Sequence, residues 1–203
     1  MRSILVLLLA TVISSISVTQ LKPQTTDVHT LYLQDQEDRG IGGKAVSNWQ
    51  DRVKRDAERR DRVRELIKRG ALKTGEDFHD AAFVFQHSVQ TDEYPADAVA
   101  NDFLLAHVLA NVAIAKGDSK SLWISAASLD RYLQLTGRPQ VFGTQYQSKD
   151  NGPVTQDPYD SALIPDALRA VFCVPPIKQQ ELNVAEFDAG KYPKGILPPG
   201  CSR

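Results

Sequence analysis

The sequence predicts an all-α fold, a compact bundle of antiparallel helical hairpins followed by an irregular, Pro/Gly-rich C-terminal tail. Between residues 45 and 176, apolar residues recur at helical spacing in successive segments. Glycine or proline ends these segments, as expected where helices stop. The 203 residues, of which 42% are hydrophobic, suit one domain of ordinary size.

Residues 1–20 have the outline of a secretory signal peptide. One Arg precedes an apolar run over residues 4–13, and small residues follow at Ser15 and Ser17. The run is short for a membrane span, although an uncleaved anchor is the alternative. We therefore expect an exported protein, periplasmic or extracellular, with no stable membrane insertion after signal removal. The net charge of −1 does not indicate nucleic acid as a partner.

Residues 21–44 are predicted to form a flexible N-terminal segment that ends in the glycine-rich stretch 40–43, with a brief helix over 31–39. The first long helix is expected over 45–69, where Gly70 ends it. This segment is rich in Arg, but acidic residues are interleaved at favourable i,i+4 spacing. Its charged side is therefore interpreted as a solvated face, in preference to a surface that binds an acidic partner.

A second helix is expected to begin at Thr74, which forms a capping-box pattern with Asp77. One side of this helix carries His79, Gln86 and His87 on a surface otherwise made of Ala and Phe. The histidine spacing does not match a two-histidine i,i+4 metal motif. Residues 88–101 then read as a polar loop, broken by a proline at position 95.

Residues 102–116 are apolar on nearly every side and predict the central, buried helix. Asp102 is placed to cap its N-terminus. Only His107 and Asn111 interrupt the apolar surface, as i,i+4 neighbours on one stripe. Such a histidine is either a satisfied core residue or a ligand-contacting one.

The next helix starts at Asp118 or Ser119, and Gly137 ends it. Asp130 falls within its apolar arc, so its carboxylate needs a partner from elsewhere. The loop from Gly137 to Gln145 is rich in donors and follows directly. Asp130 either fastens this loop to the bundle or forms a ligand site with it.

Beyond residue 146 the pattern weakens, with a short helix expected over 164–172 and one or two helical turns over 179–189. The helical domain is accordingly assigned to 45–176 and the tail to 177–203. In an exported protein, Cys173 and Cys201 read as one disulfide that tethers this tail. Such a loop would stabilise the fold by on the order of 3 kcal/mol.

Four stretches, DFHDAAFVFQHS, LLAHVLANVAIAKGD, LWISAASLDRYLQLTGRPQVFGTQY and PDALRAVFCVPP, resemble a family of bacterial proteins of unknown function. Its hallmarks are a Gln-His pair, an Asp-Arg pair and a Gly-x-x-Gln-x-Phe/Tyr-Gly-Thr-Gln loop. They match Gln86-His87, Asp130-Arg131 and residues 137–145. In many members an acidic residue closely follows the Gln-His pair, whereas here Asp92 is the first. The resemblance covers roughly residues 47–176 and implies a helical fold, but no established reaction.

The polar residues set into apolar helical surface give two functional hypotheses. The first is a binding module for a small molecule or peptide, with a site around Gln86-His87, Asp130-Arg131 and the 137–145 loop. The alternative is an extracytoplasmic hydrolase in which a His/Asp pair activates water directly. No cofactor or metal site is expected, because the histidines have no recognisable ligand spacing. The candidate catalytic residues are His87, His107 and Asp130, and the candidate binding residues are His79, Gln86, Asn111, Arg131, Gln140, Thr144 and Gln145.

Overall fold

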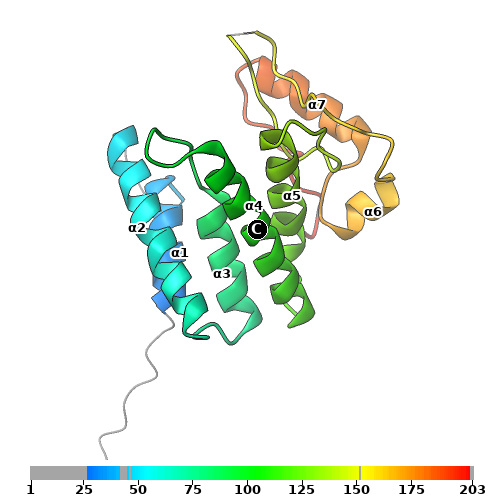
Figure 1. Ribbon diagram of the computed structural model, residues 1–203. Helices are drawn as coiled ribbons and strands as arrows, with labels where there is room; N and C mark the ends of the chain where they lie inside the picture. The colour runs from blue at the N-terminus through cyan, green and yellow to red at the C-terminus, as the bar shows by residue number, and fades with distance from the viewer. Residues whose placement is uncertain (1–26, 42–44, 46, 151, 202–203) are drawn as a thin grey trace, which may run out of the picture.

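The fold is all-α, as predicted. The computed structural model describes residues 27–41, 45, 47–150 and 152–201, and its regular structure there is helical (Figure 1). The predicted signal peptide, residues 1–20, lies outside the described residues. The helices are α1 (Asp27–Asp38), α2 (Trp49–Lys68), α3 (Gly75–Gln86), α4 (Ala96–Ala115), α5 (Ser121–Leu135), α6 (Asp166–Val171) and α7 (Ile177–Asp188).

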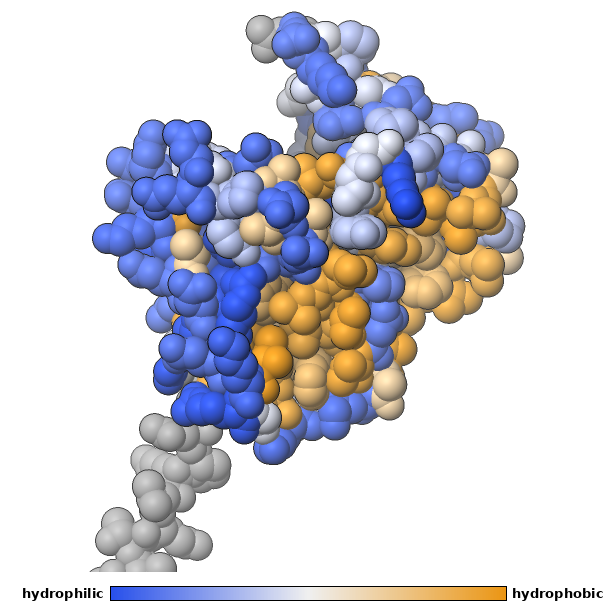
Figure 2. Space-filling view, in the orientation of Figure 1, coloured by the Kyte–Doolittle hydropathy of each residue, from blue (hydrophilic) through white to orange (hydrophobic). Residues whose placement is uncertain are grey.

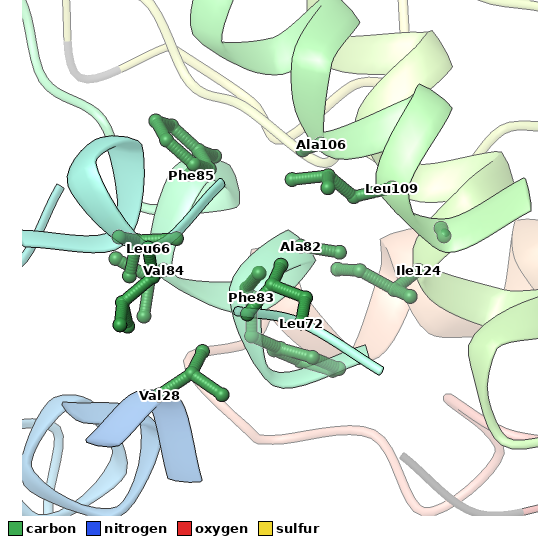
Figure 3. Close-up of a cluster of buried hydrophobic side chains, with 13 residues drawn as sticks. Val28, Leu66, Leu72, Ala82, Phe83, Val84, Phe85, Ala106, Leu109 and Ile124 are labelled. Carbon is green, nitrogen blue, oxygen red and sulfur yellow. The ribbon is translucent and has the colours of Figure 1, made fainter. Parts of the chain in front are cut away.

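The main core lies where α3 meets its neighbours. α4 packs against α3 on one side and α5 on the other, while α1 and α2 cover the remaining side of α3. Phe85 and Ile124 are fully buried in this core. Each such side chain contributes roughly 1.5–3 kcal/mol when removed from water. Figure 3 shows that the buried side chains come from α1 through α5 and fill the space between them.

Part of the segment expected to be flexible forms a regular helix, α1. α1 starts four residues before the expected 31–39 helix and places Val28 in the main core. Its inner side is polar: Asp35 and Asp38 are buried, and Asp38 pairs with Arg59 of α2. This helix could not be recognised by apolar periodicity because much of its buried side is charged.

The charged side of α2 is not simply a solvated face, which corrects the sequence interpretation. Asp56, Arg59 and Arg60 are buried. Arg59 contacts Asp56 at 2.5 Å and Asp38 of α1 at 2.8 Å. Other acidic partners lie on different helices, Asp38 on α1 and Asp102 on α4, so spacing within α2 could not indicate which arginines are buried.

α4 begins at Ala96, six residues before the expected start, with Pro95 as the N-cap. Asp102 therefore lies inside the helix and does not cap it. Its carboxylate is 1% exposed and accepts hydrogen bonds from Ser88 Oγ at 2.5 Å and Tyr94 Oη at 2.8 Å. These bonds tie the loop before α4 to its second turn.

α4 also carries the exposed apolar surface seen in Figure 2, which continues toward α6, whereas the α2 side is hydrophilic. The exposed apolar side chains of these helices include Leu104 and Val108 on α4, and Leu168 and Val171 on α6. By length and composition α4 could cross a membrane, with a mean hydropathy of 1.6 over its most apolar window. A helix packed at the centre of a bundle meets the same criterion.

The C-terminal third forms a smaller cluster against the outer side of α5 (Figure 1). Phe142 and Val174 are its buried centre, together with Ala126 of α5. α6 is shorter than the expected 164–172 helix, and Pro165 is its N-cap. α7 shows that the region assigned to the tail begins with three helical turns. The predicted Cys173–Cys201 disulfide is present and joins the end of the chain to the residues after α6.

Candidate functional site

Asp130 fastens the 137–145 loop to α5. One carboxylate oxygen accepts the backbone N–H groups of Val141 and Phe142 at 2.8 and 3.0 Å. The other accepts the Thr144 N–H and hydroxyl at 2.9 and 2.7 Å. Burial raises the pKa of Asp130, while these donors oppose that shift. With both oxygens engaged by the loop, the carboxylate has a structural role.

Gln140 fixes the same loop from within. Its side chain is fully buried, with Oε1 accepting the Gln145 N–H at 3.0 Å and Nε2 donating to the carbonyls of Gln145 and Gln156. Gln140 therefore has a structural role rather than presenting its amide to a ligand. Gly143 allows the close approach of α7, because a Cβ at this position would collide with Gln180 and Tyr159.

The three expected catalytic residues do not hydrogen-bond to one another. His87 Nδ1 contacts Asp35 of α1 at 2.8 Å. His107 Nδ1 donates to the Ser125 carbonyl at 2.9 Å, and Asn111 Nδ2 lies 3.0 Å from His107 Nε2. The His87–His107–Asp130 grouping expected from the sequence is therefore replaced by three separate hydrogen-bonded clusters. The partners come from elements whose packing no local spacing encodes.

Arg131, next to Asp130, is in a different situation. Its Nε donates to Gln145 Oε1 at 2.9 Å, and its Nη1 donates to the Gln86 carbonyl at 2.8 Å. Among the described residues, no carboxylate forms an ion pair with this guanidinium. Burial, together with the positive charge of Arg39, lowers the pKa of Arg131 to about 10. The site is thus a partly buried positive charge that is held by an amide and a carbonyl oxygen and lies 5.7 Å from the ring centroid of Phe103.

A cavity of about 320 Å³ opens beside Arg131, and we refer to it as the arginine cavity. Arg131, Thr144 and Gln145 supply polar groups to its wall. An aromatic wall comes from Tyr146, Phe187 and Tyr192, whose neighbouring ring centroids lie 4.9 and 5.8 Å apart. Its other lining residues are Trp123, Gln147, Ser148, Val154 and Ile196. Gln86 is close by through its carbonyl, and its buried Oε1 has no hydrogen-bond partner among the described residues.

A second cavity, of about 370 Å³, lies at the other end of α3, and we call it the histidine cavity. His29 and Tyr32 of α1 and His79 and Asp80 of α3 line it. His29 Nδ1 lies 2.7 Å from Asp80 Oδ2, with the histidine side chain 42% exposed and the aspartate 2% exposed. The remaining lining residues are Gly75, Glu76, Lys116, Gly117, Asp118 and Lys120.

The protons in the histidine cavity can be assigned from the donors available. Ser121 Oγ donates to Asp118 Oδ2 at 3.0 Å, so it accepts from His79 Nδ1 at 2.9 Å. This leaves His79 Nε2 as a lone-pair acceptor. Likewise, an ionised Asp80 accepts from His29 Nδ1–H and leaves His29 Nε2 basic.

The electrostatics of this cavity follow mainly from burial. Desolvation raises the pKa of Asp80 to about 6, although the hydrogen bond from His29 opposes the shift. Desolvation also lowers the pKa of His79, which is consequently neutral at pH 7. The pKa of Tyr32 is raised by burial and by the nearby Asp80 and Asp35 carboxylates, so its hydroxyl keeps its proton.

Of the candidate residues taken from the sequence, only His79 lies in the histidine cavity. His29 and Tyr32 were missed because they belong to the segment expected to be flexible. Asp80 follows His79 directly, and only the packing of α1 shows that the two side chains share one cavity. Among the described residues, no group of three or more His, Cys, Asp or Glu side chains is arranged to hold a metal ion.

Comparison with protein-family models, curated proteins and solved structures finds no match. The function is therefore inferred from the chain's own residues.

Proposed function

We propose that the chain binds a small anionic molecule in the arginine cavity. The observation that carries this proposal is the Arg131 guanidinium, a partly buried charge at a cavity wall without an anionic partner among the described residues. A charge that is partly removed from water without a counter-ion is costly, and a bound carboxylate or phosphate would offset that cost. The planar guanidinium of arginine also presents paired N–H donors that match two oxygens of a carboxylate or a phosphate.

The aromatic wall of the cavity suggests the body of the ligand. Tyr146, Phe187 and Tyr192 form a continuous aromatic surface on which an aromatic ring or an apolar chain can pack. A volume of about 320 Å³ suits a small molecule better than a folded peptide. The ligand class is therefore a small carboxylate or phosphate attached to an aromatic or apolar group.

Asp130 and the loop amides position the residues of the cavity wall and do not contact the ligand. They hold Thr144 and Gln145 in place, and Gln145 in turn orients Arg131 through its Oε1. The sequence hypothesis of a polar binding site around Asp130-Arg131 and the loop is kept, with Arg131 as the contact and Asp130 as the support. The alternative hydrolase built on His87, His107 and Asp130 has no geometric support.

We also propose export as the cellular context. The apolar N-terminal run has signal-peptide character, and a disulfide between Cys173 and Cys201 is typical of oxidising compartments. Fractionation of cells that express the tagged chain, with N-terminal sequencing of the product, tests this. Recovery of an uncleaved chain in the cytoplasm would refute it.

Binding is tested by calorimetric or NMR titration of the purified protein with benzoate and phenyl phosphate, with benzyl alcohol as the uncharged match. We expect at least one of the two anions to bind at least ten-fold more tightly than the alcohol. Arg131→Gln should remove that preference, whereas Arg138→Gln should not, because Arg138 is exposed outside the cavity.

Arg131 also holds the end of α3, so its replacement affects folding as well. Tyr192→Ala removes part of the aromatic wall. Because the Tyr192 side chain is 70% exposed, the variant should keep the parent melting temperature while its affinity for the anions falls at least five-fold. Equal affinity of anions and alcohol in the parent, or unchanged binding in both cavity variants, would overturn the proposal.

A further inference from the structure

We propose that the histidine cavity is a general-base site that hydrolyses small, uncharged carboxylic esters by direct attack of water. His29 is assigned as the catalytic base, Tyr32 as the oxyanion donor and Asp80 as the residue that positions His29. This site shares no residue with the arginine cavity, so the two proposals stand or fall separately.

The first argument is the arrangement of His29 and Asp80. A buried carboxylate behind Nδ1 fixes the ring orientation and leaves Nε2 as the basic atom, while the partly exposed ring lines the cavity. This is the relationship between an orienting acid and a catalytic histidine in hydrolases. The pairing joins α1 to α3 over 51 positions of sequence, so the two elements must be docked for the base to be oriented.

The second argument is a donor on the same helix as the base. Tyr32 lies three residues after His29, one helical turn away, with the two ring centroids 6.2 Å apart. The Tyr32 ring is held edge-on against His79 and Phe83, at centroid distances of 5.9 and 5.6 Å. Its hydroxyl makes no hydrogen bond to another described residue and is available to a substrate oxygen.

The third argument concerns the charge of the substrate. Lys116 and Lys120 line the cavity together with three acidic residues, Glu76, Asp80 and Asp118, so both signs of charge are present and acids outnumber lysines by one. The wall therefore has no excess of positive charge that would select an anion. His79 Nε2, an acceptor by the proton assignment above, suits a hydroxyl or amide group on the substrate. A volume of about 370 Å³ limits the substrate to a small molecule.

The reaction balances with water as the only co-reactant. Water gives a proton to His29 Nε2 as its oxygen bonds to the ester carbonyl carbon, and the carbonyl oxygen becomes an oxyanion that accepts a hydrogen bond from the Tyr32 hydroxyl. The oxyanion then re-forms the carbonyl, the bond to the alkoxy oxygen breaks, and His29 returns its proton to the departing alcohol. One ester and one water give one acid and one alcohol.

The test is hydrolysis of p-nitrophenyl acetate by the purified full-length protein, with p-nitrophenyl phosphate as the charged comparison. His29→Asn keeps a side-chain N–H donor for Asp80 but has no basic nitrogen. We expect kcat/KM for the acetate to fall at least ten-fold, with an unchanged melting temperature. His107→Gln is the matched control, since His107 lies outside the cavity, and should retain the parent rate.

Two further measurements separate catalysis from structure. Tyr32→Phe should lower kcat more than it changes KM, because the hydroxyl acts on the oxyanion. Imidazole added to His29→Ala should restore part of the lost rate. Parent turnover no faster than free histidine, equal losses in the His29→Asn and His107→Gln variants, or the phosphate as the better substrate would each overturn the assignment.

Discussion

His29 and Asp80 join α1 to α3 through a 2.7 Å contact between the ring Nδ1 and the carboxylate Oδ2. The same two helices are joined at their other ends by Asp35 and His87, at 2.8 Å, with the acid and the imidazole exchanged between the helices. The packing of α1 thus depends on two histidine–aspartate pairs as well as on Val28 in the core.

Asp80 gives stability a defined pH dependence. Its pKa in the folded protein is about 6, against 3.8 for an ordinary aspartate, mainly because of burial; His29 on α1 lowers it, and Glu76 and Asp77 on α3 raise it further. Between those values the folded state binds more protons than the unfolded chain, so this group's contribution to stability falls as pH rises, by at most about 3 kcal/mol. Urea unfolding of the parent and of Asp80→Asn at pH 4, 5, 6 and 7 tests this. The unfolding free energy of the parent should exceed that of the variant by an amount that shrinks as pH rises. Parallel profiles would contradict it.

His87 acts in the opposite direction. Burial lowers its pKa below the ordinary 6.5, so on acidification the unfolded chain takes up a proton before the folded state does. Its contribution to stability is therefore present above pH 6.5 and decreases as pH falls below that value. His87→Gln should reduce the rise in unfolding free energy between pH 5 and 7, with the remainder coming from His79, whose pKa is also lowered. His107→Gln should keep the full rise, because both of the other residues are still present.

Removal of the Asp130 carboxylate should unfold the loop or the whole domain. Asp130→Ala leaves three backbone N–H groups and the Thr144 hydroxyl without their acceptor, and we expect a loss of about 3–5 kcal/mol. Asp130→Asn keeps one carbonyl acceptor and should cost less. Asp92→Ala, at an exposed loop position, should change stability by less than about 0.5 kcal/mol. Equal unfolding free energies for the Asp130→Ala and Asp92→Ala variants would show that the hydrogen bonds between Asp130 and the loop do not stabilise the fold.

The Cys173–Cys201 disulfide should support both stability and the arginine cavity. It closes a separation of 28 residues that includes Phe187, Tyr192 and Ile196 of the cavity wall. A Cys173→Ser/Cys201→Ser double variant should lose about 3 kcal/mol on the chain-entropy account. In titrations, affinity for the anionic probe should fall as the wall loosens, while p-nitrophenyl acetate turnover at the distant histidine cavity should not change.

Alanine substitutions at Gly143 and Gly137 separate the cost of backbone strain from the cost of a steric clash. Both have positive φ, at +80° and +75°, but a Cβ would meet Gln180 and Tyr159 at Gly143 and open space at Gly137. Gly137→Ala should cost about 1–2 kcal/mol from backbone conformation alone. Gly143→Ala should cost at least about 2 kcal/mol more, because the buried, hydrogen-bonded Gln180 amide and the Tyr159 ring have to move. Similar melting temperatures for the two variants would argue against the close approach.

The sequence alone determined those features that depend on residues close together along the chain. The Thr74–Asp77 capping box begins α3 as predicted, with the Thr74 hydroxyl accepting the Asp77 N–H at 3.1 Å. Apolar periodicity gave the all-α class, and the placement of Asp130 on the apolar arc of α5 correctly required partners from the following loop. In each case the interacting residues are close in sequence, at most 14 positions apart for Asp130 and Thr144.

Only the tertiary structure decided which distant side chains became partners. α1 docks through charges on its inner side, so it has no clear apolar stripe, and the His29–Asp80 pair spans 51 positions. Partners on distant elements also decide which arginines of α2 are buried. For the same reason His87, His107 and Asp130 belong to separate hydrogen-bonded clusters. Burial of a charged group depends on a counter-charge or an amide supplied by another element, and the spacing of residues along one helix does not carry that information.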